Sequence, residues 1–287
     1  MKLPSYTLEQ LREAPHLSYS ALNTYLNICQ LQYFFRYVEK IEPERTPVAL
    51  PFGTAFHSTL SEQAQSAKKG ELLSAEQLTE IFATYFKSNC DNAANLVFKK
   101  EDNQDDLIAT AARMLETVTR EWCDYWNIEA VAMPFRVDIP GTELPLIGEI
   151  DMVVAEALPF SEEPVTPCLV DFKTAARMWP DGKADRDLQA TVFSYAFEKL
   201  TGKRPTFRFD VITKTKTPAV RHFYTTRLPD DYNRLERLIQ AVGHAIQAGV
   251  FLPNETSFAC SDCPYASHCR TWHCSAKSSA SATKVAA

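Results

Sequence analysis

The residues best suited to chemistry lie at positions 169–174, which read LVDFKT. If this stretch is a β-strand, Asp171 and Lys173 project from the same face and hold a carboxylate beside an ammonium group. Positions 146–151 read LIGEID and end on a second carboxylate, Asp151. A hairpin between the two strands would bring Asp151 beside Asp171.

Two carboxylates held close together repel each other at neutral pH unless a cation lies between them. Oxygen ligands favour hard divalent ions such as Mg²⁺ or Mn²⁺. The two strands therefore predict a divalent-metal site with a lysine at its edge. Either strand taken alone is better explained as an exposed face with incidental charged side chains, so the prediction depends on their pairing.

Residue periodicity indicates the elements that would position these side chains. Apolar residues recur at helical spacing over 17–40, after the candidate caps Ser18 and Ser20. Further helices are predicted for a segment that begins at Gly53, and for 76–88, 105–127, 185–201 and 230–249. Short β-branched or apolar runs predict strands at 131–139, 145–155, 167–174, 205–214 and 219–227. This order predicts an α/β or α+β fold with a mixed sheet.

Four motifs, in this order, resemble those of the PD-(D/E)XK nuclease superfamily and, within it, the RecB-type branch. They are G-x-x-x-H at Gly53 to His57, G-x-x-D at Gly148 to Asp151, D/E-x-K at Asp171 to Lys173, and the start of Q-x-x-x-Y at Gln189. The last motif departs from the family, because Phe193 stands where a tyrosine is expected. Tyr195 lies about 240° round the helix from Gln189, so its role stays open.

Cysteines near the C-terminus form a second candidate site. Three of them have the spacing C-x2-C-x5-C: Cys260, Cys263 and Cys269. Such a set needs a fourth ligand, and Cys274 or His273 would complete a local zinc knuckle. Cys29 would instead make a long-range clasp around a [4Fe–4S] cluster. The local spacing of the C-terminal cysteines favours zinc. The other three cysteines are interpreted as plain buried thiols: Cys90, Cys123 and Cys168.

The resemblance points to the iron–sulfur alternative. A cysteine on the N-terminal helix followed by a C-terminal C-x2-C-x5-C is similar to the pattern of the CRISPR adaptation (Cas-four-like) exonucleases and of related helicase-nuclease domains. It implies a restriction-endonuclease-like mixed sheet flanked by helices, with a helical N-terminal insertion and a cysteine-ligated C-terminal clasp. The expected organisation is an extension at 1–16, one nuclease domain at 17–274 and a disordered tail at 275–287. Within the domain we expect a helical segment at 54–127, a sheet core at 131–227 and the cysteine cluster at 260–274.

The resemblance also implies a function and the roles of individual residues. We expect a metal-dependent DNA exonuclease that acts on single-stranded or unwound DNA. Mg²⁺ or Mn²⁺ would be bound by His57, Asp151, Asp171 and the backbone carbonyl of Phe172. Lys173 would orient the attacking water and stabilise the developing charge, and Gln189 would position substrate or water.

Composition and charge restrict the remaining possibilities. Of the 287 residues, 45% are hydrophobic and 23% charged, which is typical of globular proteins and excludes fibrous or wholly disordered classes. No leader or membrane span is found, so we expect a cytoplasmic protein. No P-loop pattern is found either, so we expect a free-standing nuclease without a helicase motor. The net charge is −6, yet residues 199–227 carry eight basic side chains and one acid. This segment is either a DNA-binding face, with Arg208, Lys214 and Lys216 as contacts, or a solvated basic surface.

Two other functional classes stay open at this point. The chain could be a nuclease-fold subunit that binds DNA without cutting it, although all the expected ligands are present. It could also be a zinc-binding interaction protein, which would leave the paired carboxylates unexplained. The expected partner besides DNA is a helicase, a recombinase or a CRISPR integrase.

Overall fold

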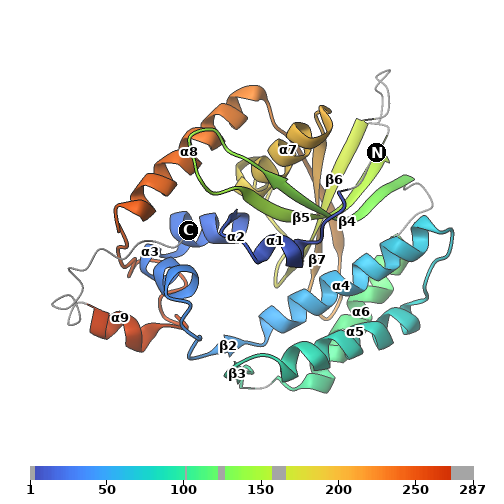
Figure 1. The fold of residues 1–287 in the computed structure, drawn as a ribbon. Helices are drawn as coiled ribbons and strands as arrows, with labels where there is room; N and C mark the ends of the chain where they lie inside the picture. Colours follow the sequence, from blue (N-terminus) through green and yellow to red (C-terminus); the bar gives the residue numbers. More distant parts are fainter. Residues whose placement is uncertain (1–3, 101, 122–126, 157–165, 273–287) are drawn as a thin grey trace.

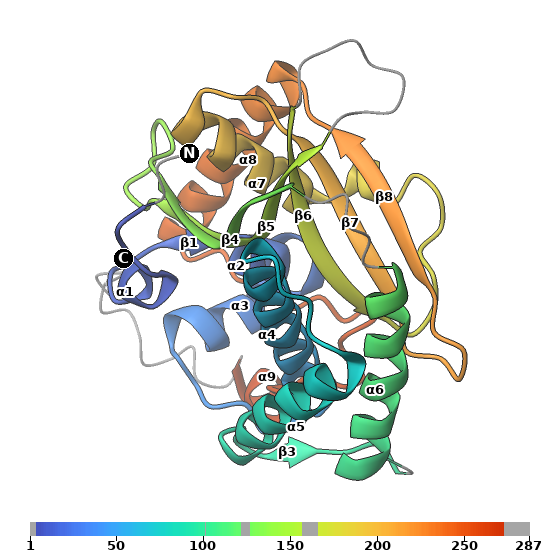
Figure 2. The same cartoon turned by 90° about the vertical axis from the view of Figure 1, so that its right-hand side faces the viewer.

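The computed structural model describes residues 4–100, 102–121, 127–156 and 166–272. Across these residues a six-stranded mixed sheet lies between two groups of helices (Figures 1 and 2). Its strands are β1 (Leu17–Ser18), β4 (Asn127–Val137), β5 (Leu146–Glu156), β6 (Thr166–Ala175), β7 (Thr206–Thr213) and β8 (Val220–Thr226). A separate parallel pair consists of β2 (Thr46–Pro47) and β3 (Leu96–Val97).

The helices are α1 (Leu8–Arg12), α2 (Tyr19–Asn23), α3 (Gln30–Tyr33), α4 (Ala49–Lys68), α5 (Ala75–Asp91), α6 (Gln104–Glu121), α7 (Leu188–Thr201), α8 (Pro229–Gln247) and α9 (Ala266–Trp272). Side chains of α4, α5 and α6 pack on one face of the sheet. Those of α2, α7 and α8 pack on the other face. The pattern on α6 explains its packing, because Ala111, Met114, Leu115 and Val118 are buried and follow the spacing of one helix face.

The sheet is mixed because strand directions change along it. Strands β4, β5 and β6 are antiparallel neighbours, β7 runs parallel to β6, and β8 returns antiparallel to β7. All eight residues of β7 are buried, as expected for a strand covered by helices on both faces. The predicted fold class is therefore confirmed as a mixed sheet flanked by helices, consistent with a restriction-endonuclease-like fold.

The predicted continuous helix over 17–40 is wrong, because the segment is broken at Cys29. Ser18 does cap its beginning, since Ser18 Oγ accepts a hydrogen bond from the Ala21 amide at 3.2 Å. Residues 24–28 and 34–38 form π-helical turns, and Cys29 between them is extended, with φ −167° and ψ 126°. Cys29 therefore lies at a break between two helical segments and not on the buried face of one continuous helix.

Other differences concern the ends of elements and the shortest elements. Helix α4 begins at Ala49, four residues before the predicted start at Gly53. The short elements α1, β1, β2, β3 and α9 were not predicted, because they contain too few residues to show a period. The predicted tail at 275–287 lies outside the described residues. No described helix is long and apolar enough to cross a membrane.

Candidate active site

The two carboxylates meet where β5 and β6 pair. These strands are antiparallel, with Met152 opposite Val170, so Asp151 and Asp171 come to neighbouring positions. The predicted hairpin is therefore confirmed. The Asp171 side chain is only 2% exposed and that of Asp151 is 19% exposed.

Asp171 is held by groups from its own strand and from α7. Lys173 Nζ lies 2.6 Å from Asp171 Oδ2, as expected for side chains that share one strand face. Gln189 Nε2 donates a hydrogen bond to Asp171 Oδ1. Gln189 is itself fixed because Asp187, the N-cap of α7, accepts a hydrogen bond from the Gln189 amide at 3.0 Å.

Asp151 is held by α4 and by the backbone of β6. Its Oδ2 atom accepts a hydrogen bond from the Phe172 amide at 2.9 Å and lies 3.1 Å from His57 Nδ1. His57 is one helical turn beyond Gly53 on α4. A Cβ atom at Gly53 would meet nothing within 4 Å, so this glycine leaves open space beside the histidine.

The glycine of the second motif has a packing role. A Cβ atom at Gly148 would lie 2.5 Å from the Phe135 ring on the neighbouring strand β4. Any larger side chain would displace this ring, which is fully buried. Gly148 therefore allows Phe135 to pack against β5, three residues before Asp151.

Electrostatics distinguish the two carboxylates. Burial raises the pKa of Asp171 to about 6; Lys173 opposes this rise and Asp151 adds to it. For Asp151 burial acts in the same direction, but His57 and the Phe172 amide outweigh it and lower the pKa. Burial opposes the charged form of His57, yet the nearby Asp151 raises its pKa. The surroundings therefore favour the charged form of Asp151 and disfavour the charged form of Asp171.

The donor set fits a hard divalent cation, although it is not preassembled as a coordination sphere. Asp171 Oδ2 is buried and accepts no hydrogen bond of regular geometry, with Lys173 as its charge partner. Two carboxylates and an imidazole offer oxygen and nitrogen donors of the kind that Mg²⁺ or Mn²⁺ accepts. Among the described His, Cys, Asp and Glu side chains, no three are grouped closely enough to hold an ion as they stand.

Comparison with known proteins agrees with this geometry. The family model of the PD-(D/E)XK nuclease superfamily matches residues 16–270. The chain belongs to this superfamily. Members of the PD-(D/E)XK superfamily typically use divalent metals such as Mg²⁺ or Mn²⁺ and act as hydrolases on nucleic acid.

One solved structure supports the same fold. A "putative exonuclease" from Eubacterium rectale is 14% identical, with 91% of this chain and 93% of that chain covered and a TM-score of 0.55. The structure of SSO0001 is 10% identical, covers 86% of this chain and 93% of that chain, and has a TM-score of 0.34. At these identities the first comparison shows the fold alone, and the second supports no argument. A comparison with curated proteins finds no match.

The fourth PD-(D/E)XK motif differs from the family, and Tyr195 does not replace its tyrosine. Tyr195 is fully buried, and its hydroxyl donates to Glu236 on α8 at 2.7 Å. Phe193 packs edge-on against Tyr19, with 6.5 Å between ring centroids. The Tyr19 hydroxyl donates to Asp187 at 3.4 Å, and burial together with Asp187 and Asp171 raises its pKa. Tyr19 thus lies at the site, and none of the four motifs identified it.

The three basic residues expected to bind DNA have different environments. Arg208 is 1% exposed and donates twice to Asp210, at 2.8 and 3.2 Å, so it belongs to the sheet interior rather than to a DNA-binding face. Lys214 is half-buried, with Nζ 4.8 Å from the centroid of the Phe52 ring, and burial lowers its pKa. Lys216 is exposed in the turn between β7 and β8.

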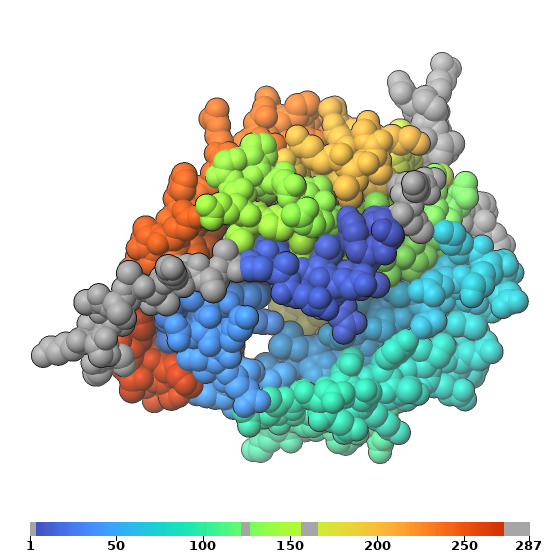
Figure 3. Space-filling view, in the orientation of Figure 1, coloured from blue at the N-terminus to red at the C-terminus, as the bar shows by residue number. Residues whose placement is uncertain are grey.

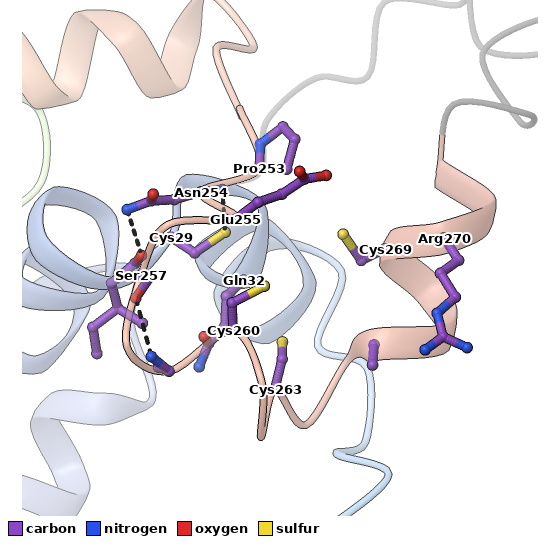
Figure 4. A pocket seen from close by; sticks show the side chains of 13 residues that line it. Cys29, Gln32, Pro253, Asn254, Glu255, Ser257, Cys260, Cys263, Cys269 and Arg270 are labelled. Carbon is purple, nitrogen blue, oxygen red and sulfur yellow. Dashed lines mark hydrogen bonds between the residues drawn. The ribbon is translucent and has the colours of Figure 1, made fainter.

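Four cysteines from distant parts of the chain line one pocket of about 290 Å³. Figure 4 shows Cys29, Cys260, Cys263 and Cys269 approaching it from the N-terminal segment, the loop after α8, and α9. The backbone amide of Asn254 donates to Cys29 Sγ at 3.4 Å. Cys90 and Cys168 are buried elsewhere, as predicted. The alternative ligands His273 and Cys274, and the predicted buried thiol Cys123, lie outside the described residues.

Proposed function

We propose that the protein is a Mg²⁺- or Mn²⁺-dependent DNA exonuclease that hydrolyses phosphodiester bonds in single-stranded or unwound DNA. The observation that carries this proposal is the meeting of Asp151, Asp171, Lys173 and Gln189 at one end of the β5–β6 pair. This arrangement combines two carboxylates with a cation and a fixed amide. It suits stabilisation of the negative charge that develops on a phosphate during hydrolysis.

Each residue has a separate role in the proposed reaction. His57, Asp151, Asp171 and the backbone carbonyl of Phe172 would hold the ion, which supplies Lewis-acid chemistry and an activated water. Lys173 approaches Asp171 from the partly open side of the site, where its ammonium group would orient the water and stabilise charge on the phosphate. Gln189 holds Asp171 Oδ1, and Asp171 Oδ2 faces Lys173, where it would be available as a ligand.

Two observations support attack from a free DNA end. The similar solved protein from Eubacterium rectale is described as a putative exonuclease. In addition, Figure 3 shows an opening through the molecule between the N-terminal segment (blue) and the lighter blue and teal helices that include α4. A strand that enters an opening enclosed by protein must have a free end. A closed circular single strand should therefore be cut much more slowly than a linear one.

We propose that the cysteine pocket holds a [4Fe–4S] cluster rather than a single zinc ion. One zinc ion with Zn–S bonds of about 2.3 Å requires its sulfur atoms to be about 4 Å apart. No three of the described cysteines are grouped in this way, although Cys29, Cys260, Cys263 and Cys269 line the same pocket. A [4Fe–4S] cluster would use all four of these cysteines as ligands, and the Asn254 amide would donate to one of them.

The role of such a cluster would be structural, because hydrolysis needs no electron. It would connect the break at Cys29 to the segment that contains the other three cysteines. We place the protein, as a single nuclease domain over 17–274, in the cytoplasm and in recombination, repair or CRISPR spacer acquisition. A helicase, recombinase or CRISPR integrase would supply the unwound DNA.

A cleavage assay on an end-labelled single strand tests the proposal. The anaerobically purified protein should cleave the strand in Mn²⁺ or Mg²⁺ and stop when EDTA is added. Lys173→Ala should lower the rate by at least about a hundredfold, in keeping with the removal of one charge-stabilising group. Lys68→Ala, on the far part of α4, is the matched control and should cleave at the normal rate. Undiminished cleavage by Lys173→Ala would remove this lysine from the site.

A further inference from the structure

A groove of about 490 Å³ lies directly beside the candidate active site. Tyr19 and Asp187 line it, and they also belong to the network around Asp171. The Asp187 side chain accepts a hydrogen bond from the Gln189 amide at 3.0 Å, and Gln189 binds Asp171. Two residues of the groove wall are thus linked to Asp171 by hydrogen bonds that run from Tyr19 through Asp187 and Gln189.

Phe258 lines the same groove and is 87% exposed, more than any other large apolar side chain among the described residues. Its position is set by the turn that carries it. The Ser257 amide donates to the Asn254 carbonyl at 3.2 Å, and the Cys260 amide donates to the Ser257 carbonyl at 3.0 Å. The loop that walls the cysteine pocket therefore presents an aromatic ring to the groove beside the active site.

Basic side chains continue the groove away from Phe258. Arg186 and Lys183 line the first groove, and a second groove of about 290 Å³ shares Arg186 and extends to Arg234 on α8. The acidic side chains here already have partners within the protein: Asp187 pairs with Lys183, Asp185 accepts from Thr225, and Asp231 accepts from the Leu228 amide. Arg186 and Arg234 are both exposed.

The geometry points to a binding track for single-stranded DNA, in which Phe258 stacks on one base and Arg186 and Arg234 contact backbone phosphates. An exposed aromatic ring beside cations suits a strand whose bases are free to stack. A duplex keeps its base faces covered, so it would gain no contact with Phe258. The inference rests on the proposed nuclease function and adds the path of the substrate next to the catalytic carboxylates.

Affinity for a labelled single strand, measured in EDTA so that no cleavage occurs, tests this track. Phe258→Ala should weaken binding by about tenfold, which corresponds to about 1.4 kcal/mol for one stacked base. Phe258→Tyr should bind within about twofold of the wild type, because it keeps the ring. Leu72→Ala, another exposed apolar residue far from the groove in sequence, is the matched control. A base analogue whose fluorescence is quenched by stacking should lose that quenching in Phe258→Ala.

Arg234 has a matched control on its own helix, because Arg237 is also on α8. The double variant Arg186→Ala with Arg234→Ala should weaken single-strand binding at least tenfold and should also flatten its salt dependence. Arg237→Ala should change neither quantity. Arg237 is exposed on α8 but lines neither groove. Binding by Phe258→Ala within twofold of the wild type would overturn the track. An equal loss of affinity for duplex and single strand would overturn it as well. A wild-type protein that binds but never cleaves would contradict the nuclease proposal alone, since these measurements need no metal.

Discussion

At the residue scale, Asp171 is the most informative group in the molecule. It is almost fully buried next to a second carboxylate, and burial raises its pKa to about 6. The sequence could predict its pairing with Lys173 from the period of a strand. It could not predict the raised pKa, because the burial comes from α7 and from strands distant in the chain.

The raised pKa leads to a prediction about stability. A carboxyl group whose folded-state pKa is raised favours the native state below about pH 4, and this contribution is lost as the pH rises through about 6. In the metal-free protein at pH 8, Asp171→Asn should therefore raise the free energy of unfolding by about 1 to 3 kcal/mol. Denaturant titrations at pH 8 and pH 4 check this, and the difference should shrink at pH 4. Equal stability of both proteins at pH 8 would contradict it.

The two motif glycines should respond to alanine in opposite directions. Gly148→Ala should lower the free energy of unfolding by about 1 to 3 kcal/mol, because the new methyl group would overlap the buried Phe135 ring. Gly53→Ala should raise it by about 0.5 to 1 kcal/mol, because Gly53 is inside α4 and has open space around it. Urea unfolding of both variants measures the two effects. Similar changes in both variants would contradict this account of the glycines.

At the element scale, the long helices and strands could be predicted from sequence, whereas the N-terminal segment could not. Strands β5 and β6 show clear alternation, and their predicted hairpin is present. The break at Cys29 has no local signal, because it is stabilised by contacts with residues far along the chain. Leu31 donates its amide to the Leu252 carbonyl at 3.2 Å, and Asn254 donates to Cys29 Sγ.

The break at Cys29 should therefore depend on the cysteine site. The anaerobically purified protein should be brown and contain about four iron atoms per chain. Cys29→Ala should lose the colour and much of the solubility, because the N-terminal segment is released from the cysteine loop. Cys274→Ala should keep both. Iron analysis and absorption spectra measure this, and a colourless protein with one zinc ion that depends on Cys274 would contradict the cluster.

At the scale of the whole molecule, charge is less segregated than the sequence suggests. Residues 199–227 have eight basic side chains, but several pair with acids elsewhere in the fold. Arg208 binds Asp210 two residues along the same strand, β7. Lys199 lies 3.6 Å from Glu236, and Arg221 lies 2.7 Å from Asp181. The last two pairs cannot be read from a charge count, because their acidic partners are outside residues 199–227. Fewer unpaired basic side chains are therefore exposed than the charge count of residues 199–227 suggests.

Lys214 and Lys216 are the two lysines of this segment that we propose as DNA contacts; Lys216 is exposed and Lys214 is half-buried. If they bind phosphates, the double variant Lys214→Ala with Lys216→Ala should have a shallower salt dependence of single-strand binding. The slope of log affinity against log salt should change by about 0.7 for each phosphate that the variant no longer neutralises. Fluorescence anisotropy over a range of salt concentrations measures it. An unchanged slope would mean that these lysines form only a solvated surface.

The most direct test of the central claim compares Asp171→Ala with the wild type in one pair of measurements, cleavage of a single strand in Mn²⁺ and affinity for the same strand in EDTA. We expect cleavage to be abolished and affinity to stay within a few fold, because Asp171 is buried at the proposed metal site and does not line the two grooves proposed to bind DNA. Undiminished cleavage by Asp171→Ala, in protein free of contaminating nuclease, would contradict the assignment of the active site.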